Sequence, residues 1–280
     1  MDYEAEYNNR GRVPDHAAIV EEWLTSSEAA RAELAARAEM DLAYDTASPR
    51  TTLDLFWPEG ADDRTPVAVF IHGGYWRSFD NKAFSFVARG LTGNGVAVAL
   101  PTYDLCPAVS MAEIVDEVRR ACVWLYRRLG RRFAVGGHSA GGHLTAAMLA
   151  TDWAAIDPAL PQDLVRHGMP ISGLFELETL IGTTLNADLR LDAAEARRLS
   201  PLDQAPPKDA VLDIVVGGDE SRTFIKQSRD FDARWSAAGA GTRLDVAEGA
   251  NHFSVILPLG DPHSDLSRRF AALARAAAAL

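Results

Sequence analysis

Short apolar runs alternate with helix-like segments along most of the chain, and this pattern restricts the fold more than any other feature of the sequence. Residues 67–71, 96–100, 133–135 and 212–216 are short apolar runs. Such runs are typical of strands that are buried on both faces of a parallel sheet. The segments between them carry apolar residues at helical spacing, as from Ile114 to Leu129. The alternation predicts an α/β fold with a mostly parallel central sheet and helices on both faces.

Two segments fall outside this alternation. Residues 15–43 are rich in Ala, Glu and Leu, so we expect helices there, within an N-terminal helical segment of residues 1–45. Residues 172–208 form a polar, helix-prone stretch between two predicted strands. We expect both segments to lie over the strand ends, with residues 172–208 as a cap or lid, in a single domain that spans residues 1–280.

Charge and cysteine content exclude several classes of partner. The chain has 28 Lys and Arg against 39 Asp and Glu, a net charge of −11, and no dense basic stretch. We therefore expect no nucleic acid partner and no anionic membrane surface. The two cysteines, Cys106 and Cys122, match no zinc or redox spacing, and no other metal motif occurs, so no metal site is predicted.

The N-terminus lacks the features of a signal peptide and no apolar run could span a bilayer, which predicts a cytoplasmic protein.

One pentapeptide has the spacing of a serine nucleophile. A G-x-S-x-G sequence lies between a predicted strand and a predicted helix and reads Gly137-His138-Ser139-Ala140-Gly141. In α/β-hydrolases a tight strand-to-helix turn of this kind raises the serine hydroxyl above the sheet edge. The helix N-terminus also favours negative charge that develops there. Ser139 is therefore the candidate nucleophile.

A serine nucleophile needs a base and an acid, which follow it in the order acid, then histidine, in this fold. His252 lies after the last predicted strand and before the final helix, where the base is expected. The acid follows the preceding strand, where Asp219 and Glu220 are adjacent. The spacing from Gly217 favours Glu220, and Asp219 stays open as the alternative. Of the other histidines, His138 and His143 are expected to be structural hydrogen-bonding residues, and those in polar stretches, including His167, to be solvated.

A glycine pair after the first buried strand completes the candidate site. The segment following residues 67–71 reads His72-Gly73-Gly74-Tyr75-Trp76. Paired glycines let backbone N–H groups turn toward a developing oxyanion. We expect the amides of Gly74, Tyr75 and Ala140 to form the oxyanion hole. Tyr75 and Trp76 either line the substrate pocket or pack beneath the N-terminal helices.

Together these motifs resemble the α/β-hydrolases marked by HGGxW, whose best-known members are kynurenine formamidases. The matching stretches occur in order at residues 72–76, 103–107, 137–144, 172–175, 199–202, 224–228 and 251–253. The resemblance implies Ser139 as nucleophile, His252 as base and the His72 loop as oxyanion hole. One position departs from the family, because its members usually carry an aspartate as the acid where this chain has Glu220.

The resemblance implies a cofactor-free serine hydrolase that cleaves a small ester or an aryl formamide through an acyl-enzyme. N-Formylkynurenine is the expected formamide, and a general carboxylesterase is the alternative. A transacylase or a non-catalytic binding protein on the same scaffold are more remote alternatives. A zwitterionic substrate tail would need polar partners, for which Arg77, Asn81 and Lys82 are candidates. The exposed face of the N-terminal helices could serve a homodimer, although no feature requires one.

Overall fold

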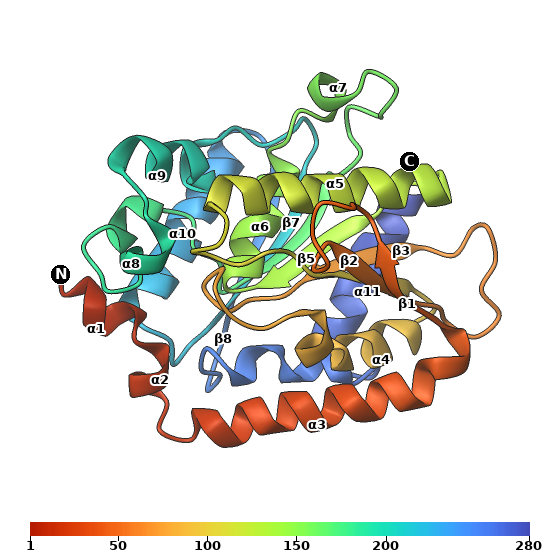
Figure 1. Ribbon diagram of the computed structural model, residues 1–280, viewed down its shortest axis with the longest axis horizontal. Coiled ribbons are helices and arrows are strands. Elements are labelled where there is room, and N and C mark those ends of the chain that lie inside the picture. The colour runs from red at the N-terminus through yellow and green to blue at the C-terminus, as the bar shows by residue number, and fades with distance from the viewer.

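An eight-stranded sheet forms the centre of the molecule (Figure 1). The structure is a computed structural model and describes residues 1–280. The strands follow one another across the sheet in the order β1-β2-β4-β3-β5-β6-β7-β8. Their bounds are β1 Ala38–Ala43, β2 Thr52–Phe56, β3 Val67–Ile71, β4 Ala97–Pro101, β5 Ala134–His138, β6 His167–Ile171, β7 Val211–Gly217 and β8 Gly241–Ala247.

The molecule has two hydrophobic cores, one on each face of the sheet, and strand direction and side-chain alternation explain them. Only β2 runs against the other strands, since it is antiparallel to both β1 and β4, while β4, β3, β5, β6, β7 and β8 are parallel. Successive side chains of a strand point to opposite faces. In β3, Val67, Val69 and Ile71 therefore join one hydrophobic core, and Ala68 and Phe70 join the other. The predicted mostly parallel sheet is confirmed.

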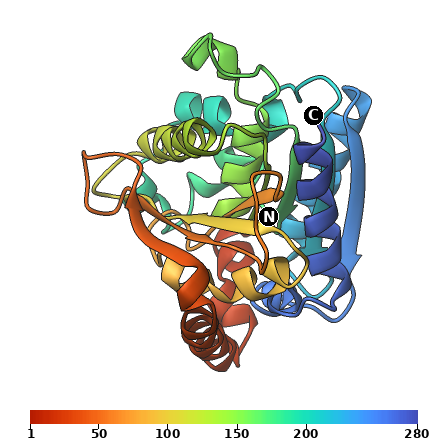
Figure 2. The ribbon, with the colours of Figure 1, turned by 90° about the vertical axis from the view of Figure 1, so that its right-hand side faces the viewer.

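Helices cover both faces of the sheet, as predicted (Figures 1 and 2). The core on one face includes residues of α5, α6 and α10, and the core on the other includes residues of α3, α4 and α11. The helix bounds are α1 Tyr3–Tyr7, α2 Asn9–Arg12, α3 His16–Leu34, α4 Phe86–Thr92, α5 Met111–Leu129, α6 Ala140–Leu149, α7 Trp153–Ile156, α8 Asn186–Leu189, α9 Ala193–Leu199, α10 Arg222–Ala237 and α11 Asp265–Ala278. Short 3-10 helices are η1 Ala35–Arg37, η2 Asn81–Phe84, η3 Leu177–Leu180, η4 Pro201–Asp203 and η5 Ser254–Gly260. None of the helices is both long and apolar enough to cross a lipid bilayer.

Local signals fix the ends of α5. Ser110 and Glu113 form a reciprocal capping box at its start. Gly130 ends the helix in the left-handed conformation, with φ of 65°. The predicted glycine stop is therefore confirmed.

Two secondary-structure predictions are wrong. Residues 38–43, expected to continue the N-terminal helix, form β1, because pairing with β2 at the sheet edge outweighs their helix propensity. Strand β6 was not predicted, since its sequence carries Gly168 and Pro170 in place of a β-branched run. It nevertheless lies between β5 and β7, and all its residues are buried.

Candidate active site

The candidate site residues all follow the carboxyl ends of parallel strands. Ser139 follows β5, Glu220 follows β7, and His252 follows β8. The loop of residues 72–79 follows β3, the strand beside β5. In a parallel sheet these ends meet at one edge, where ligands of open α/β sheets bind. The topology therefore brings residues separated by up to 180 positions to one place.

Ser139 lies on a strained turn between β5 and α6. Its backbone has φ of 58° and ψ of −117°, a conformation that non-glycine residues rarely adopt. The turn needs a neighbour without a side chain, because a Cβ on Gly141 would lie 2.0 Å from the Ile71 carbonyl oxygen. The pattern of small residues around the serine therefore reflects close backbone approach, and α6 begins at the next residue, Ala140.

A chain of hydrogen bonds joins three of the predicted residues. Nε2 of His252 lies 3.1 Å from Oγ of Ser139. Nδ1 of His252 lies 2.6 Å from Oε2 of Glu220, and both side chains are buried. Asp219, the alternative acid, is exposed and turns away, while its backbone N–H donates to the Ala250 carbonyl at 3.0 Å. The structure thus brings Ser139, His252 and Glu220 together and leaves Asp219 outside the group.

Ser172 also joins this hydrogen-bonded group, although the sequence analysis does not predict it as a site residue. Its hydroxyl donates to Oε1 of Glu220, and the backbone N–H of Gly217 donates to the same oxygen at 2.8 Å. These two donors satisfy the carboxylate oxygen that does not face His252. The position of Ser172 directly after β6 would have identified it, had that strand been predicted.

Replacing Ser172 with alanine should lower kcat about tenfold and leave KM nearly unchanged. The loss of a hydrogen bond to a charged group costs about 1.5–3 kcal/mol, and Gly217 still holds the carboxylate in the variant. Steady-state kinetics on an activated ester measures both constants. Unchanged kcat would show that Gly217 alone orients Glu220.

The loop after β3 offers unpaired backbone donors. Gly74 has φ of 112°, and a Cβ there would lie 2.3 Å from the Ser78 carbonyl oxygen, so only glycine fits. The backbone N–H groups of Gly74 and Tyr75 donate to no acceptor within the protein. Ala140 is the first residue of α6, where N–H groups lack partners inside the helix. These three amides are the predicted oxyanion donors.

The two aromatic residues of this loop have different surroundings. Tyr75 lines the cavity above Ser139, and its hydroxyl donates to the Tyr7 carbonyl at 2.7 Å. Burial raises the pKa of Tyr75 well above its ordinary value, so the phenol stays protonated. Trp76, offered as a second pocket residue, is fully buried and packs edge-on against His143 at 5.0 Å between ring centres. Its large apolar surface joins the core beneath α5 and α6, so it does not line the cavity.

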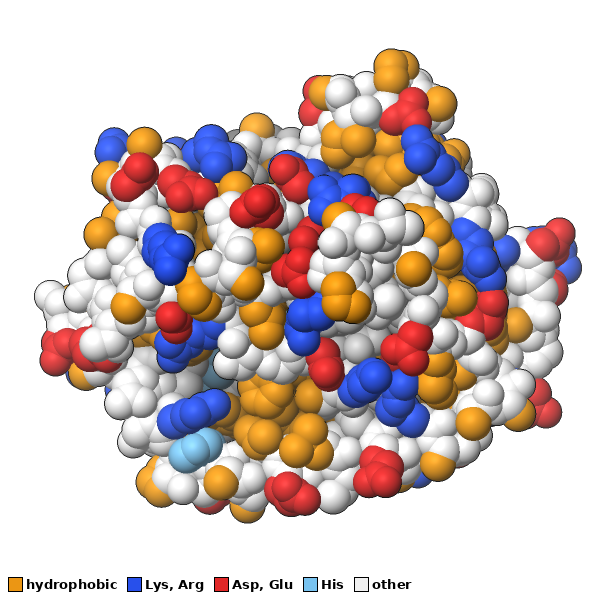
Figure 3. All heavy atoms as spheres, viewed as in Figure 1, with side chains coloured by type: hydrophobic (Ala, Val, Ile, Leu, Met, Phe, Trp, Pro, Cys, Tyr) orange, Lys and Arg blue, Asp and Glu red, His pale blue; other side chains and the backbone are white.

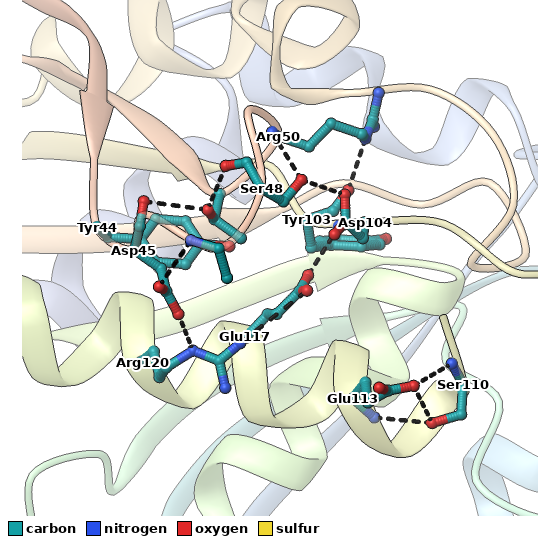
Figure 4. A network of polar contacts seen from close by, with 12 residues as sticks. Tyr44, Asp45, Ser48, Arg50, Tyr103, Asp104, Ser110, Glu113, Glu117 and Arg120 are labelled. Carbon is teal, nitrogen blue, oxygen red and sulfur yellow. Dashed lines mark hydrogen bonds and ion pairs between the residues drawn. The ribbon is translucent and has the colours of Figure 1, made fainter. Parts of the chain in front are cut away.

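Arg50, Tyr103 and Glu117 belong to a polar network (Figure 4), and two of them, Arg50 and Tyr103, also bond to the loop after β3. The ring of His72 stacks on Tyr103 with centres 4.1 Å apart, and the Tyr103 hydroxyl donates to the His72 carbonyl at 2.9 Å. Arg50 donates to the carbonyls of Tyr103 and Phe79 at 2.9 and 2.8 Å, which ties both loops together. Glu117 of α5 accepts from the backbone N–H of residue 104 at 2.7 Å. The loop that carries the predicted oxyanion donors is therefore fastened at both ends.

Replacing Glu117 with glutamine should change how stability depends on pH. Burial raises the pKa of Glu117 from 4.5 to about 7, so the folded state holds a proton that the unfolded state releases near pH 4.5. Wild-type stability consequently falls as pH rises between these values, and the glutamine variant lacks this loss. Urea unfolding should show the variant gaining on the order of 2 kcal/mol relative to wild type between pH 5 and pH 8. Equal pH slopes for the two proteins would contradict the raised pKa.

Two histidines near the serine have structural roles, as predicted. Nε2 of His138 lies 2.8 Å from the carbonyl oxygen of His252, and Nε2 of His143 lies 2.9 Å from that of Leu199. Burial, together with the neighbouring His252, holds the pKa of His138 well below its ordinary value. Burial also lowers the pKa of His143 to about 4. Both rings are neutral near pH 7 and fix the loops around Ser139.

Ser139 and His252 open into a cavity of about 690 Å³. Its walls come from the loop after β3, from the N-terminal helices α1, α2 and α3, and from residues 183–188 of the inserted segment. Aromatic side chains form much of the wall, namely Tyr7, Trp23, Tyr75, Phe79, Phe84 and Phe253. Charged side chains of both signs also line it, and acidic and basic groups are interspersed over the face shown in Figure 3. No group of three or more His, Cys, Asp and Glu residues is placed to hold a metal ion.

The three polar residues suggested for a substrate tail are separated by the structure. Arg77 lines the cavity and pairs with Asp188 at 2.5 Å. Lys82 lies outside the cavity and is 3.7 Å from Asp41. Asn81 is buried and donates to the Leu100 carbonyl at 3.0 Å. Of the three, only Arg77 lines the cavity.

Comparisons with known proteins agree with this architecture. The BD-FAE family profile matches residues 53–163. Kynurenine formamidase of Salmo salar is 32% identical over 221 residues, which cover 75% of this chain and 74% of that protein. Kynurenine formamidase of Danio rerio is 29% identical over 245 residues, or 85% and 82% of the two chains. A crystal structure from Silicibacter sp. tm1040, provisionally described as a thioesterase, superposes with a TM-score of 0.86 at 35% identity over 96% and 98% of the two chains.

The sheet topology and these relatives define an α/β-hydrolase, a serine hydrolase of the formamidase and esterase type. With 32% identity over three quarters of each chain, the protein belongs to the kynurenine formamidase family.

Proposed function

We propose that Ser139 is the nucleophile, His252 the general base and Glu220 the residue that orients His252. The observation that carries this proposal is the hydrogen-bonded chain from Glu220 through His252 to Ser139, the last two of which line the cavity. A carboxylate on Nδ1 holds the imidazole with its free nitrogen toward the hydroxyl and stabilises the imidazolium that forms. The backbone amides of residues 74, 75 and 140 form the oxyanion hole, and residues 172–208 cap the site.

In the proposed reaction Ser139 Oγ attacks the substrate carbonyl carbon while His252 Nε2 takes its proton. The negative charge on the carbonyl oxygen is stabilised by the unpaired amides. His252 then protonates the leaving nitrogen or oxygen, the bond to the carbonyl carbon breaks, and an acyl-enzyme remains. Water repeats the two steps, which releases the carboxylic acid and returns the proton to Ser139.

We propose N-formylkynurenine as the substrate, which is hydrolysed to kynurenine and formate. The relationship to kynurenine formamidases over most of the chain supports this assignment. So does the cavity wall, because aromatic side chains suit the aniline ring and charges of both signs suit its zwitterionic tail. A carboxylesterase acting on a small ester or thioester would use the same residues, and the relative described as a thioesterase favours testing it.

The substrate proposal is tested by measuring kcat/KM for N-formylkynurenine, p-nitrophenyl acetate and an acetyl thioester side by side. We expect a value of about 10⁴ M⁻¹s⁻¹ or higher on the formamide, within the usual enzymatic range. The formamide should also exceed both acetyl compounds, although an anilide has the poorer leaving group. Turnover of the ester or thioester alone would overturn the formamidase assignment and leave the serine mechanism intact.

A further inference from the structure

We propose that the ion pair of Arg77 and Asp188 binds the α-carboxylate and α-ammonium groups of an amino-acid substrate tail. The inference rests on the proposed function, since it assigns the part of the cavity that recognises the zwitterion. Nη1 of Arg77 lies 2.5 Å from Oδ2 of Asp188, and both residues line the cavity that contains Ser139 and His252. A tail whose two opposite charges are attached to one carbon needs two opposite charges held side by side, as this pair holds them.

The pair keeps hydrogen-bonding capacity for a ligand. Arg77 donates only through Nη1 to a protein acceptor, so Nε and Nη2 remain free. Asp188 accepts through Oδ2 alone, which leaves Oδ1 free. A planar guanidinium can bind a carboxylate through two parallel N–H groups, and a carboxylate oxygen accepts readily from an ammonium group. The ligand can therefore join the pair without breaking it.

The position of the pair suits recognition next to the reaction centre. Arg77 lies two residues after Tyr75, and its backbone N–H donates to the Gly74 carbonyl at 3.1 Å. Asp188 belongs to α8 of the inserted segment and lines the cavity beside Arg77. The side chains are 38% and 35% exposed, so they are partly shielded from water yet open to the cavity. Partial shielding strengthens charged hydrogen bonds relative to the fully solvated surface.

The other charged residues of the cavity fit this role less well. Both carboxylate oxygens of Glu4 already accept from Thr184, one from its backbone N–H and one from its hydroxyl. Arg10 and Glu21 line the cavity from α2 and α3, but neither has an ion-pair partner that fixes the position of its side chain. Among these residues, only Arg77 and Asp188 present fixed charges of both signs.

The test compares N-formylkynurenine with formanilide, an aryl formamide that lacks the charged tail. Arg77→Gln and Asp188→Asn should each raise KM for N-formylkynurenine roughly 10- to 100-fold, as expected when one charged hydrogen bond is lost. The kcat/KM for formanilide should change less than about threefold. Lys82→Ala and Arg12→Ala are the controls, because both remove a cation outside the cavity wall, and both should match wild type on both substrates.

Three outcomes would overturn the inference, and they are distinguishable. Equal losses on both substrates would show that the pair only supports the loop after β3. A tail-selective loss in Arg10→Ala or Glu21→Gln, with Arg77→Gln and Asp188→Asn unchanged, would move the tail site to the N-terminal helices. Wild-type protein that hydrolyses p-nitrophenyl acetate but neither formamide would overturn the proposed function, and tail binding with it. In that case L-kynurenine should also fail to inhibit ester hydrolysis.

Discussion

Replacement of Ser139 with alanine is expected to lower kcat/KM by a factor of about 10⁴ to 10⁶ on every substrate that the protein turns over. The variant keeps the cavity and the unpaired amides but has no oxygen that can attack the carbonyl carbon. KM should change little, because the serine contributes little to ground-state binding. Steady-state assays with N-formylkynurenine and p-nitrophenyl acetate measure both constants.

Ser78 provides the matched control for this experiment. It is another serine of the cavity wall and is not part of the hydrogen-bonded chain. Ser78→Ala should stay within about threefold of wild type, as expected for a contact that carries no chemistry. A Ser139→Ala variant that keeps more than a tenth of the wild-type activity would rule out the proposed covalent mechanism.

The second large loss of activity is expected when Glu220, the proposed acid, is replaced. Glu220→Gln should lower kcat by a factor of about 10³ to 10⁴, as seen when the acid of a triad is replaced by its amide. The amide N–H₂ would donate to Nδ1 of His252, which favours the tautomer whose Nε2 already carries a proton. That nitrogen then cannot take the proton of Ser139. Steady-state kinetics of the purified variant and of wild type gives the ratio of their kcat values.

Asp219 supplies the control for this prediction. It is exposed and makes no side-chain contact with His252, so Asp219→Asn should keep nearly full activity. Glu220 is buried, and circular dichroism spectra and urea unfolding curves should therefore confirm that Glu220→Gln is folded. A large loss in Asp219→Asn, together with full activity in Glu220→Gln, would reassign the acid.

The sequence could predict the sheet and the site because both depend on local signals. Buried parallel strands appear as short apolar runs, and the strained turn at Ser139 requires small neighbours that leave a recognisable pattern. Chain order then placed the candidate histidine and the candidate acid after β8 and β7, at the same edge of the sheet as Ser139. The choice between Asp219 and Glu220 needed the structure, because adjacent loop residues differ only in which side chain turns inward.

Features that depend on distant contacts could not be predicted. The segment 38–43 has helix-forming residues, and only its partner β2 makes it a strand. His167 was expected to be solvated, but it begins β6 and is buried, and burial lowers its pKa. The link from Ser172 to Glu220 and the pairing of Arg77 with Asp188 join segments 48 and 111 positions apart, which no local pattern reveals.

The most direct test of the central claim is covalent labelling with a fluorophosphonate, followed by intact-mass and peptide analysis. We predict one adduct for each wild-type chain, on the peptide that contains Ser139, and none on Ser139→Ala under the same conditions. His252→Ala should be labelled far more slowly, because its serine lacks a base. Wild-type protein that stays unlabelled, or that is labelled at another residue, would contradict an activated nucleophile at Ser139.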